Sequence, residues 1–84
     1  MIETNRLAII VDDKAVYTDD KVIIGLDFSN CNIPEDIHAL QWKDGQGEVE
    51  YRDTRHNFIV TELPDWALAC YQQFKSAPDD LPPI

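Results

Sequence analysis

The sequence is short of basic side chains, cysteine and long apolar runs. Seven Lys and Arg residues stand against sixteen Asp and Glu residues, for a formal net charge of −9. Such an acidic chain is repelled by nucleic-acid phosphates and by anionic membrane surfaces, which argues against direct binding to either. No apolar run approaches the ~20 residues that a membrane-spanning helix needs.

Cysteine is represented only by Cys31 and Cys70. Residues 1–5 are polar and lack the apolar stretch of a secretion signal. We therefore expect a cytoplasmic protein with both thiols reduced.

What is present predicts one α+β domain over residues 1–77. The apolar content of 44% is ordinary for a globular chain of 84 residues. Alternating or β-branched segments predict an antiparallel β-meander followed by a β-hairpin, with strands over residues 6–11, 14–18, 21–26, 37–43, 46–52 and 58–60. A three-to-four spacing of apolar residues predicts one C-terminal helix over residues 63–77. Residues 78–84 are acidic and Pro-rich, which predicts a mobile tail.

The meander has a register that follows from its two Asp-Asp turns. Two-residue connections place Ile9 opposite Val16 and Val16 opposite Ile23. The other face then carries a second apolar set, namely Ala8, Ile10, Ala15, Tyr17, Val22 and Ile24. Because one helix covers only one face, we predict a protein-binding or self-association interface formed by Ile9, Val16 and Ile23.

The hairpin around Asp44-Gly45 has the clearest pattern of the chain. A two-residue turn pairs Leu40 with Val49 and His38 with Tyr51. Apolar and polar residues then alternate, with Leu40, Trp42, Val49 and Tyr51 on one face and Gln41, Lys43, Glu48 and Glu50 on the other. Together with Trp66 and Phe74 of the helix, the aromatic residues of the apolar face are expected in the core.

No reactive or metal-binding motif is apparent. Cys31, His38, His56 and Cys70 lack the close pairs of a structural zinc site. A Cys31–His38 nucleophilic pair is disfavoured, since the acids near Cys31 would oppose a thiolate. The Asp-Asp turns lack the glycine and closing glutamate of a calcium loop. We therefore expect neither an enzyme nor a cofactor.

The acidity itself has two interpretations. Acidic side chains keep small proteins apart in solution, and the spread of the acids along the chain favours this reading. The alternative is an inhibitor that mimics nucleic acid and blocks a host DNA-binding enzyme.

Three segments resemble a known group of proteins. The run from Ile33 to Trp42, the run from Gly47 to Tyr51 and the run from Leu63 to Ala67 are similar to short uncharacterised proteins of tailed bacteriophages and prophages, often encoded near tail or tail-fibre genes. This resemblance implies a non-enzymatic protein that acts by protein–protein binding, in tail assembly or as an accessory part of the virion. It also implies a location in the bacterial host cytoplasm or in the virion.

Overall fold

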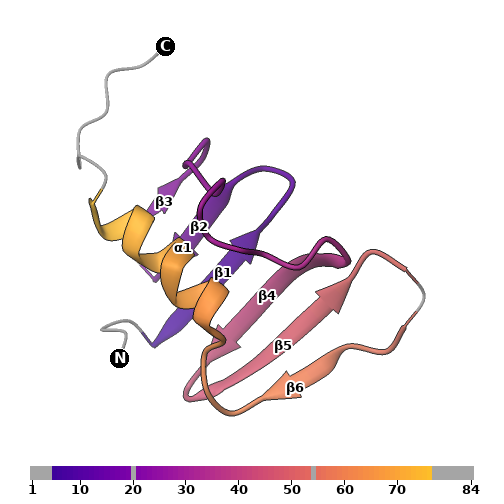
Figure 1. Ribbon diagram of the computed structural model, residues 1–84. Helices are drawn as coiled ribbons and strands as arrows, with labels where there is room; N and C mark the ends of the chain where they lie inside the picture. Colours follow the sequence, from indigo (N-terminus) through magenta and orange to yellow (C-terminus); the bar gives the residue numbers. More distant parts are fainter. Residues whose placement is uncertain (1–4, 20, 54, 77–84) are drawn as a thin grey trace.

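The computed structural model describes residues 5–19, 21–53 and 55–76. In these ranges the chain forms one antiparallel sheet and one helix (Figure 1). The strands are β1 (Arg6–Ile10), β2 (Ala15–Thr18), β3 (Val22–Ile23), β4 (Ile37–Lys43), β5 (Gln46–Tyr51) and β6 (Phe58–Val60), and the helix is α1 (Asp65–Ser76). The predicted α+β class is confirmed.

The sheet has the strand order β3-β2-β1-β4-β5-β6, with every neighbouring pair antiparallel. It consists of two three-stranded meanders joined where β1 pairs with β4. Ile9 lies opposite Val16 on one side and opposite Leu40 on the other. Val16 lies opposite Ile23, so the register predicted for the first meander is confirmed.

The β4–β5 hairpin confirms most of its predicted register. Leu40 pairs with Val49, and the turn residues Asp44 and Gly45 have φ angles of 53° and 84°. Two successive positive φ angles are the requirement of a type I′ turn, which matches the twist of the strands. The predicted pairing of His38 with Tyr51 is wrong, because the register shifts between Ile37 and Ala39 and Ile37 pairs with Tyr51. An extra residue here is a β-bulge, which a count from the turn cannot detect.

The helix begins two residues later than predicted. The carbonyl of Pro64 accepts hydrogen bonds from the backbone N–H groups of Ala67 and Leu68, each at 3.0 Å, so Pro64 precedes the first turn. Asp65 lies in the first turn and Lys75 in the last, where each charge favours the helix dipole. The buried helical residues are Trp66, Ala67, Cys70, Tyr71 and Phe74.

One face of the sheet, which we call the inner face, is covered by α1 and by the segment of residues 25–36 (Figure 1). Leu7, Ile9, Val16, Leu40 and Cys70 are the largest fully buried side chains. Leu26, Phe28 and Cys31 of the covering segment join this core. The predicted core positions of Trp42, Trp66 and Phe74 are confirmed, whereas Tyr51 is only half-buried.

The interface predicted on Ile9, Val16 and Ile23 requires correction. Their exposed fractions are 0%, 0% and 7%, so they belong to the core and not to a docking surface. The register was right, but the helix covers this face and not the other. The reason is that Leu7 and Leu40 extend the Ile9 face across β1 and β4, which makes it the wider apolar surface.

Two further expectations concern the C-terminal tail and the absence of a membrane-spanning helix. The tail predicted over residues 78–84 lies outside the described residues. Within residues 5–19, 21–53 and 55–76, no helix has both the length and the apolar character needed to cross a membrane.

Candidate functional site: the outer face of the sheet

The outer face of the sheet lies opposite α1, and no segment among residues 5–19, 21–53 and 55–76 covers it along the first meander. Since side chains alternate across a strand, the neighbours of Ile9, Val16 and Ile23 point outward. Tyr17 is 38% exposed, Val22 49% and Ile24 64%, and Ile10 beside them is half-buried. We call Ile10, Tyr17, Val22 and Ile24 the outer patch.

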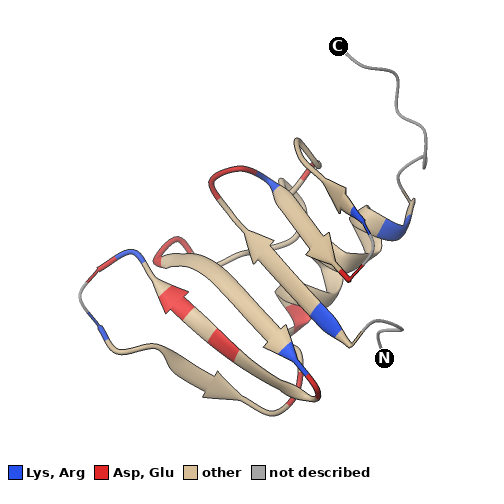
Figure 2. Ribbon diagram, turned by 180° about the vertical axis from the view of Figure 1, so that it is seen from behind, with Lys and Arg blue, Asp and Glu red and all other residues tan. Residues whose placement is uncertain are grey.

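The outer patch is continuous because alanines connect its members. Ala8 pairs with Tyr17 and Ala15 pairs with Ile10, and Tyr17 also pairs with Val22 on its other side. Figure 2, which views this face, shows uncharged ribbon along most of β1–β3. The outer patch is therefore an apolar strip on the surface of an otherwise strongly charged chain.

The second meander presents a polar outer face. Gln41 of β4 lies opposite Glu48 of β5 and Lys43 lies opposite Gln46, so polar residues share this face as the hairpin pattern predicted. The Asn57 side-chain amide donates a 2.9 Å hydrogen bond to Glu48 Oε1. The outer face thus divides into an apolar half and a mainly polar half, in which Ile59, opposite Glu48, is an exposed apolar side chain.

A hollow of about 670 Å³ lies over the polar half. Its walls include Arg6 and Lys43 as cations, Asp44 and Glu48 as anions, and Ile59 as an apolar contact. The cationic and anionic side chains that line this open hollow neutralise one another. The hollow therefore favours neither an anion nor a cation as a ligand.

Ion pairs gather at the end of the sheet that carries the β1–β2 turn. Arg52 Nη1 lies 2.6 Å from Asp12 Oδ1, and His38 Nδ1 lies 3.4 Å from Asp12 Oδ2. The pKa of the Asp12 carboxyl lies below its ordinary value, chiefly because Arg52 donates a hydrogen bond to it. Arg52 Nε also donates to the Glu35 carbonyl at 3.0 Å. Arg52 thereby ties the first turn of the sheet to the segment before β4.

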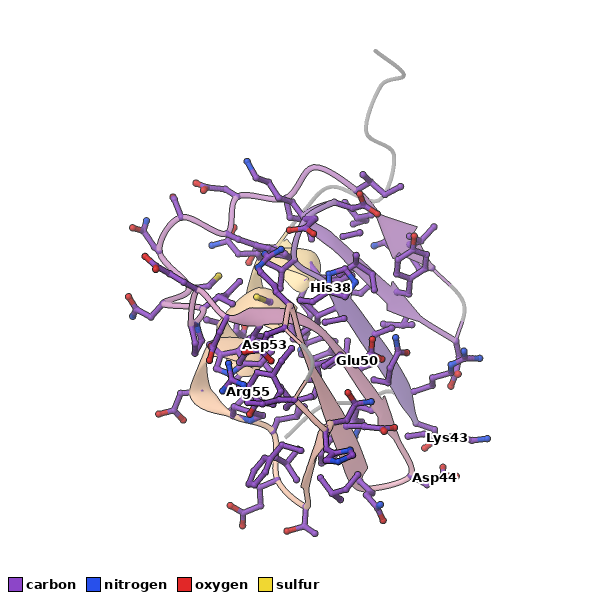
Figure 3. All side chains as sticks on the ribbon, turned by 90° about the vertical axis from the view of Figure 1, so that its right-hand side faces the viewer. His38, Lys43, Asp44, Glu50, Asp53 and Arg55 are labelled. Carbon is purple, nitrogen blue, oxygen red and sulfur yellow. The ribbon has the colours of Figure 1, made fainter. Side chains whose placement is uncertain are left out.

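Arg55 makes a second group of contacts at this end. Its Nη2 atom lies 2.6 Å from Asp36 Oδ2 and 2.8 Å from Asp53 Oδ2, and its guanidinium lies 4.2 Å from the Tyr51 ring centroid. Figure 3 shows Asp53 and Arg55 side by side, away from Lys43 and Asp44 at the hairpin turn. Hydrogen bonds from Arg55 lower the pKa of Asp53. Arg52 and Arg55 each form ion pairs with the carboxylates that they contact. This cluster therefore holds neighbouring loops together.

The cysteines lie in the core, apart from the ion pairs. Cys31 is 3% exposed and Cys70 is fully buried. Burial of the Cys70 side chain is the main cause that raises the pKa of its thiol, and the adjacent Cys31 side chain is the second. A buried, protonated thiol packs as a small apolar group and is a poor nucleophile.

The structure separates the residues that the sequence offered as ligands. His38 lies with Asp12, and His56 is exposed in the loop before β6. Among the residues that the structure describes, no three His, Cys, Asp or Glu side chains converge as a metal site would require.

Sequence reasoning missed the exposure of the last strand. Phe58 is 58% exposed and Ile59 50%, on a strand that, within the part of the chain that the structure describes, pairs only with β5. The sequence signal was the three-residue apolar segment alone, and its exposure follows from the place of β6 at the edge of the strand order. Comparisons with protein-family models, curated proteins and solved structures found no match for the chain.

Proposed function

We propose that this chain is a non-enzymatic protein-binding module of a tailed phage or prophage, and that its outer patch docks a partner protein during tail assembly or in the virion. The observation that carries the proposal is the exposure of Tyr17, Val22 and Ile24 on one uncovered strip. A contiguous apolar surface on a small chain is costly to leave in water, and a partner removes that cost. Tyrosine is also among the residues that contribute most at interfaces.

The charge around the outer patch favours a basic partner. Asp13 lies in the turn between β1 and β2 and Asp19 follows β2, whereas Asp12 in the same turn is already paired with Arg52. A partner with an apolar centre and a Lys- or Arg-rich rim would complement this surface. The net charge of −9 disfavours a second copy at this broad face.

The resemblance of the segment around Trp42 to phage proteins supports the phage setting. The nucleic-acid mimic has less support, because Asp12, Asp36 and Asp53 contact arginines and so do not act as free phosphate equivalents. Figure 2 also shows basic positions among the acidic ones across the outer face.

Site-specific photocrosslinking tests the proposal. A benzophenone amino acid replaces Tyr17 in the outer patch or, as the matched control, the exposed helical residue Gln72. The chain is expressed together with its neighbouring genes in the bacterial host. We expect one discrete crosslinked protein from position 17 and none from position 72.

A substitution pair adds specificity to that experiment. Ile24→Asp should abolish the crosslink from position 17, whereas Gln72→Asp, which adds the same charge elsewhere, should leave it intact. Raised salt should weaken the complex, because the partner is basic. Equal crosslinking from both positions, or a crosslink that survives Ile24→Asp in a folded chain, would contradict the proposal.

A further inference from the structure

The two cysteines of the chain meet in the core from two different elements. Cys31 belongs to the covering segment of residues 25–36, and Cys70 lies at the middle of α1 (Figure 1). Both are buried in the same core cluster, and their side chains lie within hydrogen-bonding reach of each other. Since the 84-residue sequence holds no other cysteine, every thiol of the chain takes part in this contact.

Local structure places each thiol at this contact. The backbone N–H of Cys31 donates a 3.1 Å hydrogen bond to the carbonyl of Phe28, which closes a turn before Asn32 with its φ of 59°. Asn30 and Asn32 on either side are exposed while Cys31 is buried, so the turn directs this one side chain into the core. Cys70 lies on the buried side of the helix that faces the sheet.

We propose that Cys31 and Cys70 are a redox pair, which a disulfide oxidant such as oxidised glutathione converts into a disulfide that fastens the covering segment to α1. A small apolar side chain at each position would be enough for packing alone. Two thiols in contact across two elements supply both halves of a cross-link as well. A reducing environment keeps them as thiols. The inference concerns the inner face, so it does not rest on the proposed function.

The exchange proceeds in two steps and begins at Cys31. Its thiolate attacks one sulfur of oxidised glutathione, which breaks that S–S bond and releases one glutathione thiolate. The Cys70 thiolate then attacks the Cys31 sulfur of the mixed disulfide and releases the second glutathione. The two protons lost by the cysteines pass to the two glutathione thiolates. Two protein thiols are thereby oxidised and one glutathione disulfide is reduced.

Opening of the covering segment sets the rate of this exchange. Residues 25–36, all of which the structure describes, form no strand or helix, so they open more readily than α1. While the segment is closed, burial keeps the pKa of the Cys70 thiol raised and the thiol protonated. Opening exposes both thiols to the oxidant. Dilute urea, below the unfolding transition, should therefore accelerate formation of the disulfide.

The cross-link also requires a small inward movement. Bonded sulfurs lie only about 2 Å apart, which is closer than two thiols in contact. The covering segment has no ladder of strand hydrogen bonds to break, so it can move toward α1 and take up the difference. The disulfide itself needs no hydrogen-bond partner, which suits the apolar surroundings of both residues.

Oxidation of the full, reduced chain with oxidised glutathione tests the inference. We expect both free thiols to disappear without a gain of bound glutathione, and digestion without reductant should join the peptides that hold Cys31 and Cys70. The melting temperature should rise by about 10 °C or more, because the bond closes a loop of about 40 residues in the unfolded chain. Dithiothreitol should reverse both changes.

Two single substitutions, each the control for the other, separate the roles of the two thiols. Cys70→Ala leaves Cys31 without its partner, so this variant should accumulate a mixed disulfide with one glutathione. Cys31→Ala leaves only the fully buried thiol, which should stay free while the first variant reacts to completion. The oxidant should raise the melting temperature of neither variant. Peptide mapping of the natural chain tests the cross-link even if a variant does not fold.

The overturning outcomes are distinct from those of the proposed function. The inference is wrong if the natural chain keeps two free thiols at every ratio of oxidised to reduced glutathione. It is also wrong if the end product is a mixed disulfide, a link between two chains, or a cross-link that lowers the melting temperature. Ile24→Asp should still form the disulfide, and Cys31→Ala should retain the crosslink from position 17.

Discussion

Gly47 directly faces Trp42 across the β4–β5 hairpin, and the indole occupies the space where a side chain at residue 47 would begin. A Cβ on residue 47 would lie 2.7 Å from Trp42 Cε3 and 2.9 Å from Val60 Cγ2. Glycine weakens a strand interior, so its presence here indicates close packing. The missing side chain lets Trp42 reach an exposed fraction of only 9%.

Gly47→Ala should therefore lower the free energy of unfolding by about 1–3 kcal/mol, the usual cost of overpacking a core. Urea denaturation, monitored by tryptophan fluorescence, measures this change in the free energy of unfolding. The neighbouring exposed Gln46→Ala serves as the control and should change stability by less than about 0.5 kcal/mol. Equal stabilities of the two variants would show that the Trp42 ring moves away at little cost.

The two faces of the first meander should respond differently to truncation. Ile9→Ala removes a fully buried side chain and should cost about 2–5 kcal/mol. Ile24→Ala removes one that is 64% exposed and should stay within about 0.5 kcal/mol. Thermal and urea unfolding of both variants checks this. A large loss with Ile24→Ala and little with Ile9→Ala would reverse the assignment of inner and outer faces.

The buried Cys70 thiol should make stability depend on pH in the alkaline range. Its pKa in the folded chain lies above the ordinary value of 9.0, so the unfolded chain loses the proton first. The contribution of the Cys70 thiol to the free energy of unfolding is therefore complete below the ordinary pKa of 9.0. It falls as pH rises above 9.0, by at most about 1.4 kcal/mol per pH unit. Urea unfolding between pH 8 and 10 should show a steeper decline for the natural chain than for Cys70→Ala. Parallel declines would remove Cys70 as the cause.

The carboxyls of Asp12 and Asp53 should titrate below their ordinary value of 3.8, each because of a different arginine. Lowered pKa values stabilise the folded state above pH 3.8, and that contribution disappears as pH falls through the folded-state values. Carboxyl NMR titrations of two variants separate the causes. Of these two carboxyls, Arg52→Gln should raise the pKa of Asp12 and not that of Asp53, and Arg55→Gln should do the reverse, so each variant is the control for the other.

The elements with local signals were predictable from the sequence. Asp44-Gly45 between two alternating segments specifies the hairpin and its register, because a two-residue turn leaves little choice of pairing. Ile9 opposite Val16 followed from the same reasoning at Asp12-Asp13, although those residues are weaker turn formers. The bulge at His38 was not predictable, since an added residue within a strand leaves no mark in the alternation that a turn-based count would detect.

The surfaces were harder to predict than the strands. Both faces of the first meander are apolar, and local pattern does not tell which face the helix covers. That choice depends on Leu40 and Trp42, about 30 residues further along the chain, which extend only the Ile9 face. The exposure of Phe58 likewise depends on the order of strands in the sheet and not on the residues around it.

The central position of β1 has a consequence for synthesis on the ribosome. β1 emerges first, yet its second neighbour, β4, begins only at Ile37. Until those residues are translated, the nascent first meander lacks both β4 and the α1 cover for Leu7 and Ile9. An incomplete chain therefore displays an unpaired strand edge and bare apolar side chains together, the combination that recruits chaperones or promotes aggregation. For this protein, the unpaired edge of β1 persists until translation delivers residues 37–43, and the apolar side chains stay uncovered until it delivers residues 65–76.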